Sequence, residues 1–279
     1  MNPPKAPSGL IYHLGKLRFV HKAVDKSGLY RLVNFLLAKW PRQKTLPRSG
    51  AVLRIGSVAG FALAEEMFQG RGYLQAVHDI KVTTFADLGC NVGWFPCFLM
   101  EAQPGSEIVG LLMDADPEVV EEANWHLKKN QLNNCEAIVG AVGCDAAKKE
   151  MVFHINPANT QSSLKPFGEN HPFPVKGKVR EIHVPALDLS VEWTKRHDNR
   201  PIDLLKIDIE GAELDFIRKE INFIQQAVKR IVCEWHGWHV TLPEIETFLA
   251  SHGFVLVEVA EQNELAGVAI FGNTRAGLP

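Results

Sequence analysis

The chain has 279 residues, of which 46% are hydrophobic and 22% charged, and its formal net charge is −2. This is the composition of a globular protein, and it excludes disorder, collagen-like repeats and coiled coil as descriptions of the whole chain. Its five cysteines form no Cys-x-x-Cys pair, which predicts a reduced, cytoplasmic protein. No apolar run approaches the roughly 18 residues that cross a bilayer, so we expect no membrane-spanning segment.

The first 54 residues hold eleven Lys or Arg and one acidic residue, so their charge is +10 and the rest of the chain carries −12. We therefore divide the chain into a basic helical extension over 1–54 and a larger domain over 55–279. Apolar residues recur at helical spacing in the stretch 11–40, and Pro41 ends the predicted helix. Two interpretations stay open: a helix that packs on the larger domain, which we favour, or a basic amphipathic segment in peripheral contact with an anionic membrane.

From about residue 80, short β-type runs alternate with helical stretches, which is typical of an α/β fold with a parallel sheet and crossover helices. Strands are predicted at 82–88, 108–113, 137–142, 202–209, 230–234, 254–259 and 268–271, and helices near 94–102, 117–131, 211–225 and 242–252. The loop between the last two strands is too short for a parallel crossover, so that pair is expected to be antiparallel. The proline-containing segment 154–180 breaks the pattern, and loops of this length are typically functional or disordered.

The strongest local motif follows the first of these strands. Asp87-Leu-Gly89-Cys90-Asn91-Val-Gly93 leads from an apolar strand into a helix, and its glycines allow a tight turn and a close approach of the backbone to a ligand. The spacing differs from the Gly-x-Gly-x-x-Gly of dinucleotide-binding proteins. Because Asp87 would repel a pyrophosphate, we expect the ligand to present a cationic or polar group there.

A carboxylate ends the next strand, about twenty residues later. Asp114 follows Leu111-Leu112-Met113, at the position where doubly wound folds bind the two ribose hydroxyls of an adenosine. We predict that Asp114 accepts hydrogen bonds from such a ribose. Asp116 is the second candidate for this role, but it precedes Pro117 and is rather expected to cap the following helix. The alternative for Asp114 is that it only caps that helix.

Two further strand ends carry charged side chains. Lys206, Asp208 and Glu210 alternate along one predicted strand, and three charges on one covered face need partners or a cavity. A pair between Lys206 and Glu210 is one interpretation, with Asp208 free to act in chemistry. Glu234 and His236 end the next strand, so we expect Asp208, Glu234 and His236 to share one crevice.

With these motifs in order, the chain resembles the FkbM family of S-adenosylmethionine-dependent methyltransferases. The resemblance lies in Asp87–Gly93, in Leu205-Lys-Ile-Asp-Ile-Glu-Gly-Ala-Glu213 and in Glu234-Trp-His236, and Glu65–Phe68 with Gly72-Tyr73 is similar to the helix that opens the family's domain. It implies a class I, Rossmann-like fold with a seven-stranded, mostly parallel sheet, and methyl transfer mainly to hydroxyl oxygens of sugars, polyketides and related small molecules. Family members often have Glu-Pro after the second strand, where this chain has Asp114-Ala-Asp-Pro117.

On this basis Asp87, Gly89, Cys90, Asn91, Gly93 and Asp114 are the predicted donor-binding residues, and His236, Asp208 and Glu234 the predicted catalytic residues. An aliphatic hydroxyl needs a base or a divalent cation to become a nucleophile. His236 is the candidate base, because an unperturbed imidazole is mostly neutral at pH 7. Asp208 and Glu234 then orient it, hold the amino group of the donor or bind Mg²⁺, and base catalysis is favoured over metal assistance. Cys90 is expected to pack against the ligand.

The predicted partner is a glycan or another small-molecule acceptor, and two competing functions stay open. A nucleic-acid (RNA) methyltransferase would use the +10 extension to bind phosphates. Nucleic acid is disfavoured, because Asp208-Ile-Glu210-Gly stands where amino-directed base methyltransferases resemble one another in an Asn-Pro-Pro-Tyr sequence. A protein that binds the donor without turnover is the second alternative, and the presence of Glu234 and His236 argues against it.

Overall fold

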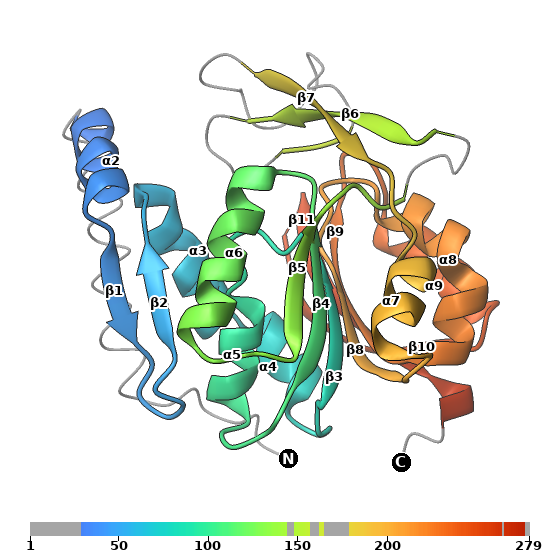
Figure 1. Cartoon of the computed structure of the whole chain (residues 1–279). Helices are drawn as coiled ribbons and strands as arrows, with labels where there is room; N and C mark the ends of the chain where they lie inside the picture. The colour runs from blue at the N-terminus through green and yellow to red at the C-terminus, as the bar shows by residue number, and fades with distance from the viewer. Residues whose placement is uncertain (1–28, 144–147, 157–161, 165–178, 264, 277–279) are drawn as a thin grey trace.

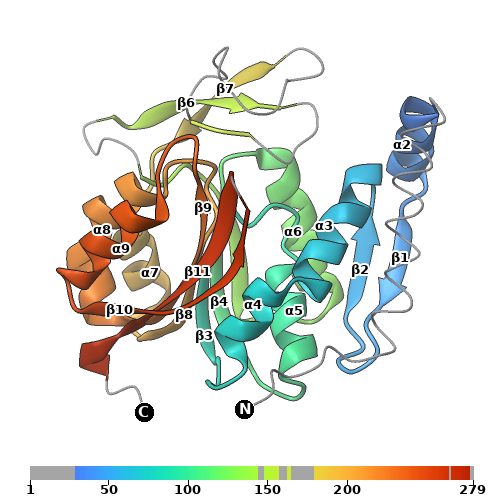
Figure 2. The same ribbon diagram turned by 180° about the vertical axis from the view of Figure 1, so that it is seen from behind.

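The computed structural model describes residues 29–143, 148–156, 162–164, 179–263 and 265–276. At its centre lies a seven-stranded sheet with a layer of helices on each face (Figures 1 and 2). The strands are β3 (Thr84–Leu88), β4 (Val109–Asp114), β5 (Cys135–Val139), β8 (Ile202–Ile207), β9 (Val228–His236), β10 (Phe254–Gln262) and β11 (Ala266–Asn273).

Strand order and direction identify the fold. The order across the sheet is β10-β11-β9-β8-β3-β4-β5, and β11 runs antiparallel to both of its neighbours while the remaining pairs are parallel. This is the class I methyltransferase arrangement, with an antiparallel last strand, that the sequence predicts. The order reverses between β3 and β8, so the carboxyl ends of these two strands border a crevice in which open α/β sheets bind ligands.

Helices cover both faces. Helices α3 (Val58–Gln69), α4 (Arg71–Val77), α5 (Phe95–Ala102) and α6 (Pro117–Lys129) lie on one side, and α7 (Leu189–His197), α8 (Glu213–Ala227) and α9 (Leu242–Ala250) on the other (Figures 1 and 2). Every residue of β3 and β8 is buried, which explains their nearly continuous apolar sequences. Alternate side chains enter different cores: Phe85 packs with α5, whereas Ala86 and Leu88 belong to the core under α7 and α8.

The predicted start of α6 is confirmed. Asp116 is the N-cap residue, its side chain accepts a hydrogen bond from the backbone N–H of Glu118, and Pro117 occupies the first turn. The predicted start of α8 at residue 211 is wrong by two residues. Glu210 and Gly211 have φ values of 50° and 95°, so they form a left-handed turn before the helix begins at Glu213.

The N-terminal extension contains more than a helix. Of the predicted helix over 11–40, α2 (Tyr30–Lys39) lies within the described residues and 11–28 lies outside them. A hairpin of β1 (Arg42–Thr45) and β2 (Val52–Ile55) follows, and its buried Leu53 and Ile55 belong to the same core as α3 and α5. The predicted domain boundary at residue 54 therefore falls inside β2.

The outer face of α2 is apolar: Leu29, Leu32, Phe35, Leu36 and Trp40 are exposed, the last by 61%. Contact of this segment with a membrane surface stays a prediction. Among the described residues, no helix has the length and apolar character needed to span a bilayer.

A second hairpin lies beyond the carboxyl ends of the central strands. Strands β6 (Glu150–Ile155) and β7 (Arg180–Pro185) pair antiparallel (Figure 1). Ser163 forms a β-bridge with His154 of β6. The two ends of the predicted long loop 154–180 thus belong to strands. Phe153, Ile155 and Val184 form a small core with Ala115 and Ala141, which anchors this hairpin over the crevice.

Candidate active site

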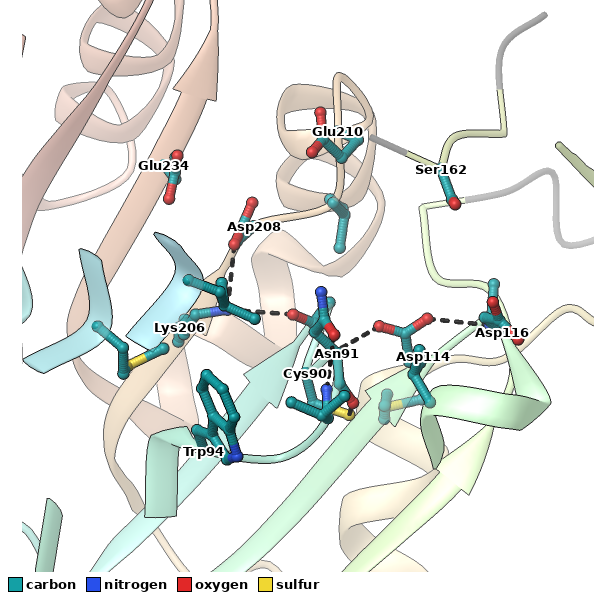
Figure 3. Close-up of a pocket in the computed structure, with 18 of the residues that line it drawn as sticks. Cys90, Asn91, Trp94, Asp114, Asp116, Ser162, Lys206, Asp208, Glu210 and Glu234 are labelled. Atoms are coloured by element: carbon teal, nitrogen blue, oxygen red, sulfur yellow. Dashed lines mark hydrogen bonds and ion pairs between the residues drawn. The ribbon is translucent and has the colours of Figure 1, made fainter. Parts of the chain in front are cut away.

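A cavity of about 440 Å³ opens at the carboxyl ends of β3, β4 and β8. Its walls come from the β3–α5 loop, from the end of β4, from the turn after β8, from Glu66 of α3 and from Ser162 and Phe153 beside the second hairpin. Figure 3 shows Asp114 on one side of this pocket and the carboxyl groups of Asp208 and Glu234 on the other. The pocket therefore lies where the sequence predicts the donor site.

Backbone hydrogen bonds hold the β3–α5 loop against the end of β4. The N–H groups of Gly89 and Cys90 both donate to the carbonyl of Met113, at 2.9 and 3.1 Å. Gly89 has a φ of 73°, and a Cβ there would overlap the carbonyl oxygen of Asp208. Only glycine allows this loop to turn between β4 and β8. Gly89, Cys90 and Asn91 all line the pocket, and their binding of the donor stays a prediction.

Asp114 lies at the end of β4 and faces the pocket (Figure 3). Its Oδ2 accepts from the backbone N–H of Asn91 at 2.8 Å, and its Oδ1 accepts from that of Asp116 at 2.9 Å. Each oxygen keeps acceptor capacity for a ligand hydroxyl. Burial raises the pKa of Asp114 to about 6, and these two backbone hydrogen bonds oppose the rise. This geometry suits the predicted ribose-binding role.

The structure contradicts the expectation that Asp87 meets a cationic group of the ligand. The Asp87 side chain is 1% exposed, is absent from the pocket lining, and lies 3.0 Å from Nζ of Lys206. The protein itself supplies the cation. Lys206 also donates to the carbonyl of Gly89 at 3.2 Å and lies 3.4 Å from Asp208. The predicted Lys206–Glu210 pair is wrong, because β8 ends at Ile207 and the alternation does not continue to Glu210.

Gly93, predicted to bind the donor, is also absent from the pocket lining. Its φ is 73°, and a Cβ there would lie 2.6 Å from the Cβ of Ala123, so Gly93 allows the loop to pack closely against α6. Cys90 agrees with its predicted packing role. Burial raises the pKa of its thiol well above the ordinary value, which leaves no thiolate nucleophile.

The three predicted catalytic residues do lie together. One ligand atom from each of Asp208, Glu234 and His236 lies within 4.8 Å of the other two. Asp208 and Glu234 line the pocket, whereas His236 is 4% exposed and does not. His236 therefore does not reach the pocket as the base that the sequence predicts.

The surroundings of His236 also contradict its predicted neutral state. Its Nδ1 lies 2.7 Å from Oε1 of the fully buried Glu213, and its Nε2 lies 3.3 Å from Oε2 of Glu210. Burial alone would lower the pKa of the imidazole, but the hydrogen bond and charge of Glu213, with Glu210 and Asp208, raise it to about 10. His236 is thus a cation at neutral pH, paired with Glu213 and Glu210.

Two residues of the site were missing from the predicted set. Glu66, on α3, lines the pocket, and burial together with the charges of Asp208 and Glu261 raises its pKa to about 7. Tyr73, on α4, donates its hydroxyl to Oε2 of Glu234 at 3.1 Å. Both lie in the segment, Glu65–Phe68 with Gly72-Tyr73, that resembles the helix opening the family's domain. That resemblance was the available sequence signal for them.

These residues fit S-adenosylmethionine. The pocket offers a carboxylate with acceptor capacity at Asp114, apolar surface at Met113 and Val142, and a glycine-containing loop between them. Across the pocket from Asp114, Asp208 and Glu234 add carboxyl oxygens (Figure 3). No observation supports Mg²⁺ as a cofactor, so that part stays a prediction.

Comparison with known proteins supports this assignment. A family model described as Methyltransferase FkbM domain matches residues 87–256. The 31-O-demethyl-FK506 methyltransferase FkbM of Streptomyces tacrolimicus is 26% identical over 255 residues, which cover 81% of this chain and 93% of that protein. Methyltransferase 1 of Beauveria bassiana (strain ARSEF 2860) is 23% identical over 179 residues, which cover 61% of this chain and 71% of the relative.

Among solved structures, a putative RNA methyltransferase from Pyrococcus horikoshii aligns with a TM-score of 0.41 and 14% identity, over 78% of this chain and 85% of that one. The family match, unlike this structural similarity, is specific, and it covers more than half of the chain. It includes the donor loop, Asp114, Asp208, Glu234 and His236. The protein is therefore a member of the FkbM family of methyltransferases, enzymes whose methyl donor is S-adenosylmethionine.

Proposed function

We propose that this enzyme transfers the methyl group of S-adenosylmethionine to a hydroxyl oxygen of a glycan or another small-molecule acceptor. The observation that carries the proposal is the placement of Asp208, Glu210 and Glu234 in the same pocket as the donor loop. A hydroxyl must lose a proton to become an effective nucleophile, and carboxylates beside the reacting centre accept it. The relative from Streptomyces tacrolimicus, named for methylation of an oxygen, supports the same assignment.

In this proposal each residue has a separate task. Asp114 accepts hydrogen bonds from the ribose of the donor, and Lys206 fixes the loop through the carbonyl of Gly89. The bound donor supplies the electrophilic methyl group. The proton of the acceptor hydroxyl moves to a carboxylate oxygen of Asp208, which faces the pocket. His236 is buried behind the pocket, and burial raises the pKa of Glu234 well above its ordinary value, so Glu234 is already protonated.

The test is a methyl-transfer assay with labelled donor and a panel of glycans, each paired with an analogue that lacks one hydroxyl. We expect the label in a methyl ether, located by mass spectrometry, and its loss with one deoxy analogue. Asp208→Asn should bind the donor within threefold of wild type and lose at least 100-fold in turnover, as expected for a lost proton acceptor. Glu121→Gln, an exposed substitution on α6, is the matched control and should keep full turnover.

Other outcomes would overturn the proposal. Methylation of an RNA base, together with salt-dependent RNA binding in a filter assay, would replace it with a nucleic-acid methyltransferase. Tight donor binding with no methylated product across the panel would indicate a protein that binds the donor without turnover.

A further inference from the structure

A cluster of metal-binding side chains lies beside the donor pocket. Asp208 follows β8, and Glu234 and His236 end the neighbouring β9, so two adjacent strand ends bring two carboxylates and one imidazole together. Their nearest ligand atoms all lie within 4.8 Å of one another. Ligands about 2.1 Å from one ion are separated by roughly 3 to 4 Å, so small side-chain rotations suffice to bring these three atoms around a cation.

The imidazole is already oriented from behind. Nδ1 of His236 is 2.7 Å from Oε1 of Glu213, a carboxylate that is fully buried and is itself held by the backbone N–H of Gly211 at 2.9 Å. Nε2 faces the acidic side chains, with Glu210 at 3.3 Å, and a metal cation bound there replaces the proton that His236 otherwise carries, which is released to solvent. A carboxylate bound to the far nitrogen of a histidine is the recurrent support of metal-ligating histidines in proteins.

The two cations beside the cluster, Lys206 and the protonated His236, are each paired with a buried acid, Asp87 and Glu213. Glu66 and Glu210 line the same pocket as Asp208 and Glu234, which gives four carboxyl groups around one small space. Lys206 lies closer to Asp87, at 3.0 Å, than to Asp208, at 3.4 Å, so its charge is shared with a buried acid below the pocket. Buried negative charge that the protein does not balance favours a bound cation.

We propose that Asp208, Glu234 and His236 form a binding site for a divalent transition-metal cation of the Mn²⁺ class. Carboxylates suit both Mg²⁺ and Mn²⁺, whereas an imidazole ligand favours the transition metal. Glu213 orients His236 in this site, and Glu66 and Glu210 line the same pocket. Because Asp208 and Glu234 also line the donor pocket, the cation lies where it polarises the oxygen of an acceptor.

The experiment uses the full chain, treated with a chelator and then dialysed, and titrates it with MnCl₂. Free Mn²⁺ is followed by electron paramagnetic resonance, so neither donor nor acceptor is needed. We expect one Mn²⁺ per chain. Asp208→Asn and Glu234→Gln should each weaken binding at least tenfold, Glu213→Gln should weaken it about 10- to 100-fold, and the control Glu121→Gln should bind as wild type does.

His236→Ala would leave Glu213 buried without its partner and risks unfolding, so the conclusion depends on Asp208→Asn, whose side chain is 27% exposed in the wild type. Absence of saturable Mn²⁺ binding to the wild type would overturn the site, as would equal affinities in Asp208→Asn and Glu121→Gln. The outcome is separable from that of the proposed function. Methyl ether formation in excess chelator would show that the reaction does not need the cation, and would leave the proposed function intact. Mn²⁺ binding without any methylation would support the cation site and contradict the proposed function.

Discussion

Replacement of Lys206 by methionine tests whether the buried pair with Asp87 holds the donor loop. The ammonium group lies 3.0 Å from Oδ1 of Asp87 and 3.2 Å from the carbonyl of Gly89, and both charged side chains are almost completely buried. Methionine keeps most of the side-chain volume and removes the charge. Lys206→Met therefore leaves the Asp87 carboxylate without its cation and the Gly89 carbonyl without its donor.

The expected loss of stability is large. Breaking a buried pair by removing one partner costs about 3 to 5 kcal/mol, against a total free energy of unfolding of about 5 to 15 kcal/mol. For a domain of this size that corresponds to a decrease in Tm of roughly 10 °C. Donor affinity should fall as well, because the carbonyl of Gly89 belongs to the loop that lines the pocket.

The loss should depend on pH in a definite direction. Burial already raises the pKa of Asp87 although Lys206 opposes the rise, so removal of Lys206 raises it further. A carboxyl group whose folded-state pKa exceeds its unfolded-state pKa stabilises the fold at low pH and loses that contribution as the pH rises. The destabilisation of Lys206→Met relative to wild type should therefore be smaller at pH 5 than at pH 8.

Chemical denaturation at both pH values measures these differences, and calorimetry measures donor binding. The matched control is the double variant Asp87→Leu/Lys206→Met, which removes both charges and should recover most of the stability. A loss below about 1 kcal/mol in Lys206→Met, or an equal loss at the two pH values, would refute the assignment of Lys206 and Asp87 as a buried ion pair.

Three further predictions concern the donor site and its supports. Asp114→Asn should weaken donor binding about 10- to 100-fold by calorimetry, as expected for a lost charged hydrogen bond. Because burial raises the pKa of Asp114 to about 6, wild-type donor affinity should fall as the pH decreases below about 6, and a wild-type affinity that is constant from pH 5 to 8 would contradict this role. Gly93→Ala should lower the free energy of unfolding by about 2 to 4 kcal/mol, because it combines a φ of 73° with a Cβ 2.6 Å from that of Ala123. The control Gly105→Ala, with a φ of 82° and open space around the Cβ, should lower it by only about 1 kcal/mol. Equal losses in the two variants would reject the packing argument. The Glu101 carboxylate accepts hydrogen bonds from backbone N–H groups of the β1–β2 turn. Glu101→Gln should therefore lower the free energy of unfolding by about 1 to 3 kcal/mol and increase proteolysis of this turn. An unchanged cleavage rate would show that the turn does not depend on Glu101.

The inner strands β3, β4 and β8 were predictable because burial on both faces leaves nearly continuous apolar sequences. The proximity of Leu88 and Asp114 also follows from the sequence, because the ends of two parallel strands joined by a crossover helix meet at the same edge of the sheet. The short elements were not predictable in the same way. Strands β6 and β7 are stabilised by pairing with each other and by the small core under them, contacts that join residues about thirty positions apart.

At the site, the sequence predicts which segments lie at the pocket but not the direction in which each side chain points. Asp87 precedes the glycine loop and was expected to face the ligand, yet alternation along β3 directs it to Lys206 on the neighbouring strand β8. Gly93 shares a motif with Gly89, but its neighbour is a helix that begins 24 residues later. Both errors arise because contacts between residues far apart in the sequence decide whether a residue meets a ligand or another part of the protein.

The case of His236 shows why protonation is harder to predict than position. A histidine at a strand end has an ordinary pKa near 6.5 only while its surroundings are ordinary. The residue that decides the matter is Glu213, in the first turn of α8, which is fully buried and directed at Nδ1 of His236. A buried acid of this kind stabilises either a proton or a cation bound at the opposite nitrogen. The same contact that excludes His236 as the neutral base therefore makes the space between Asp208, Glu234 and His236 suited to a positive charge.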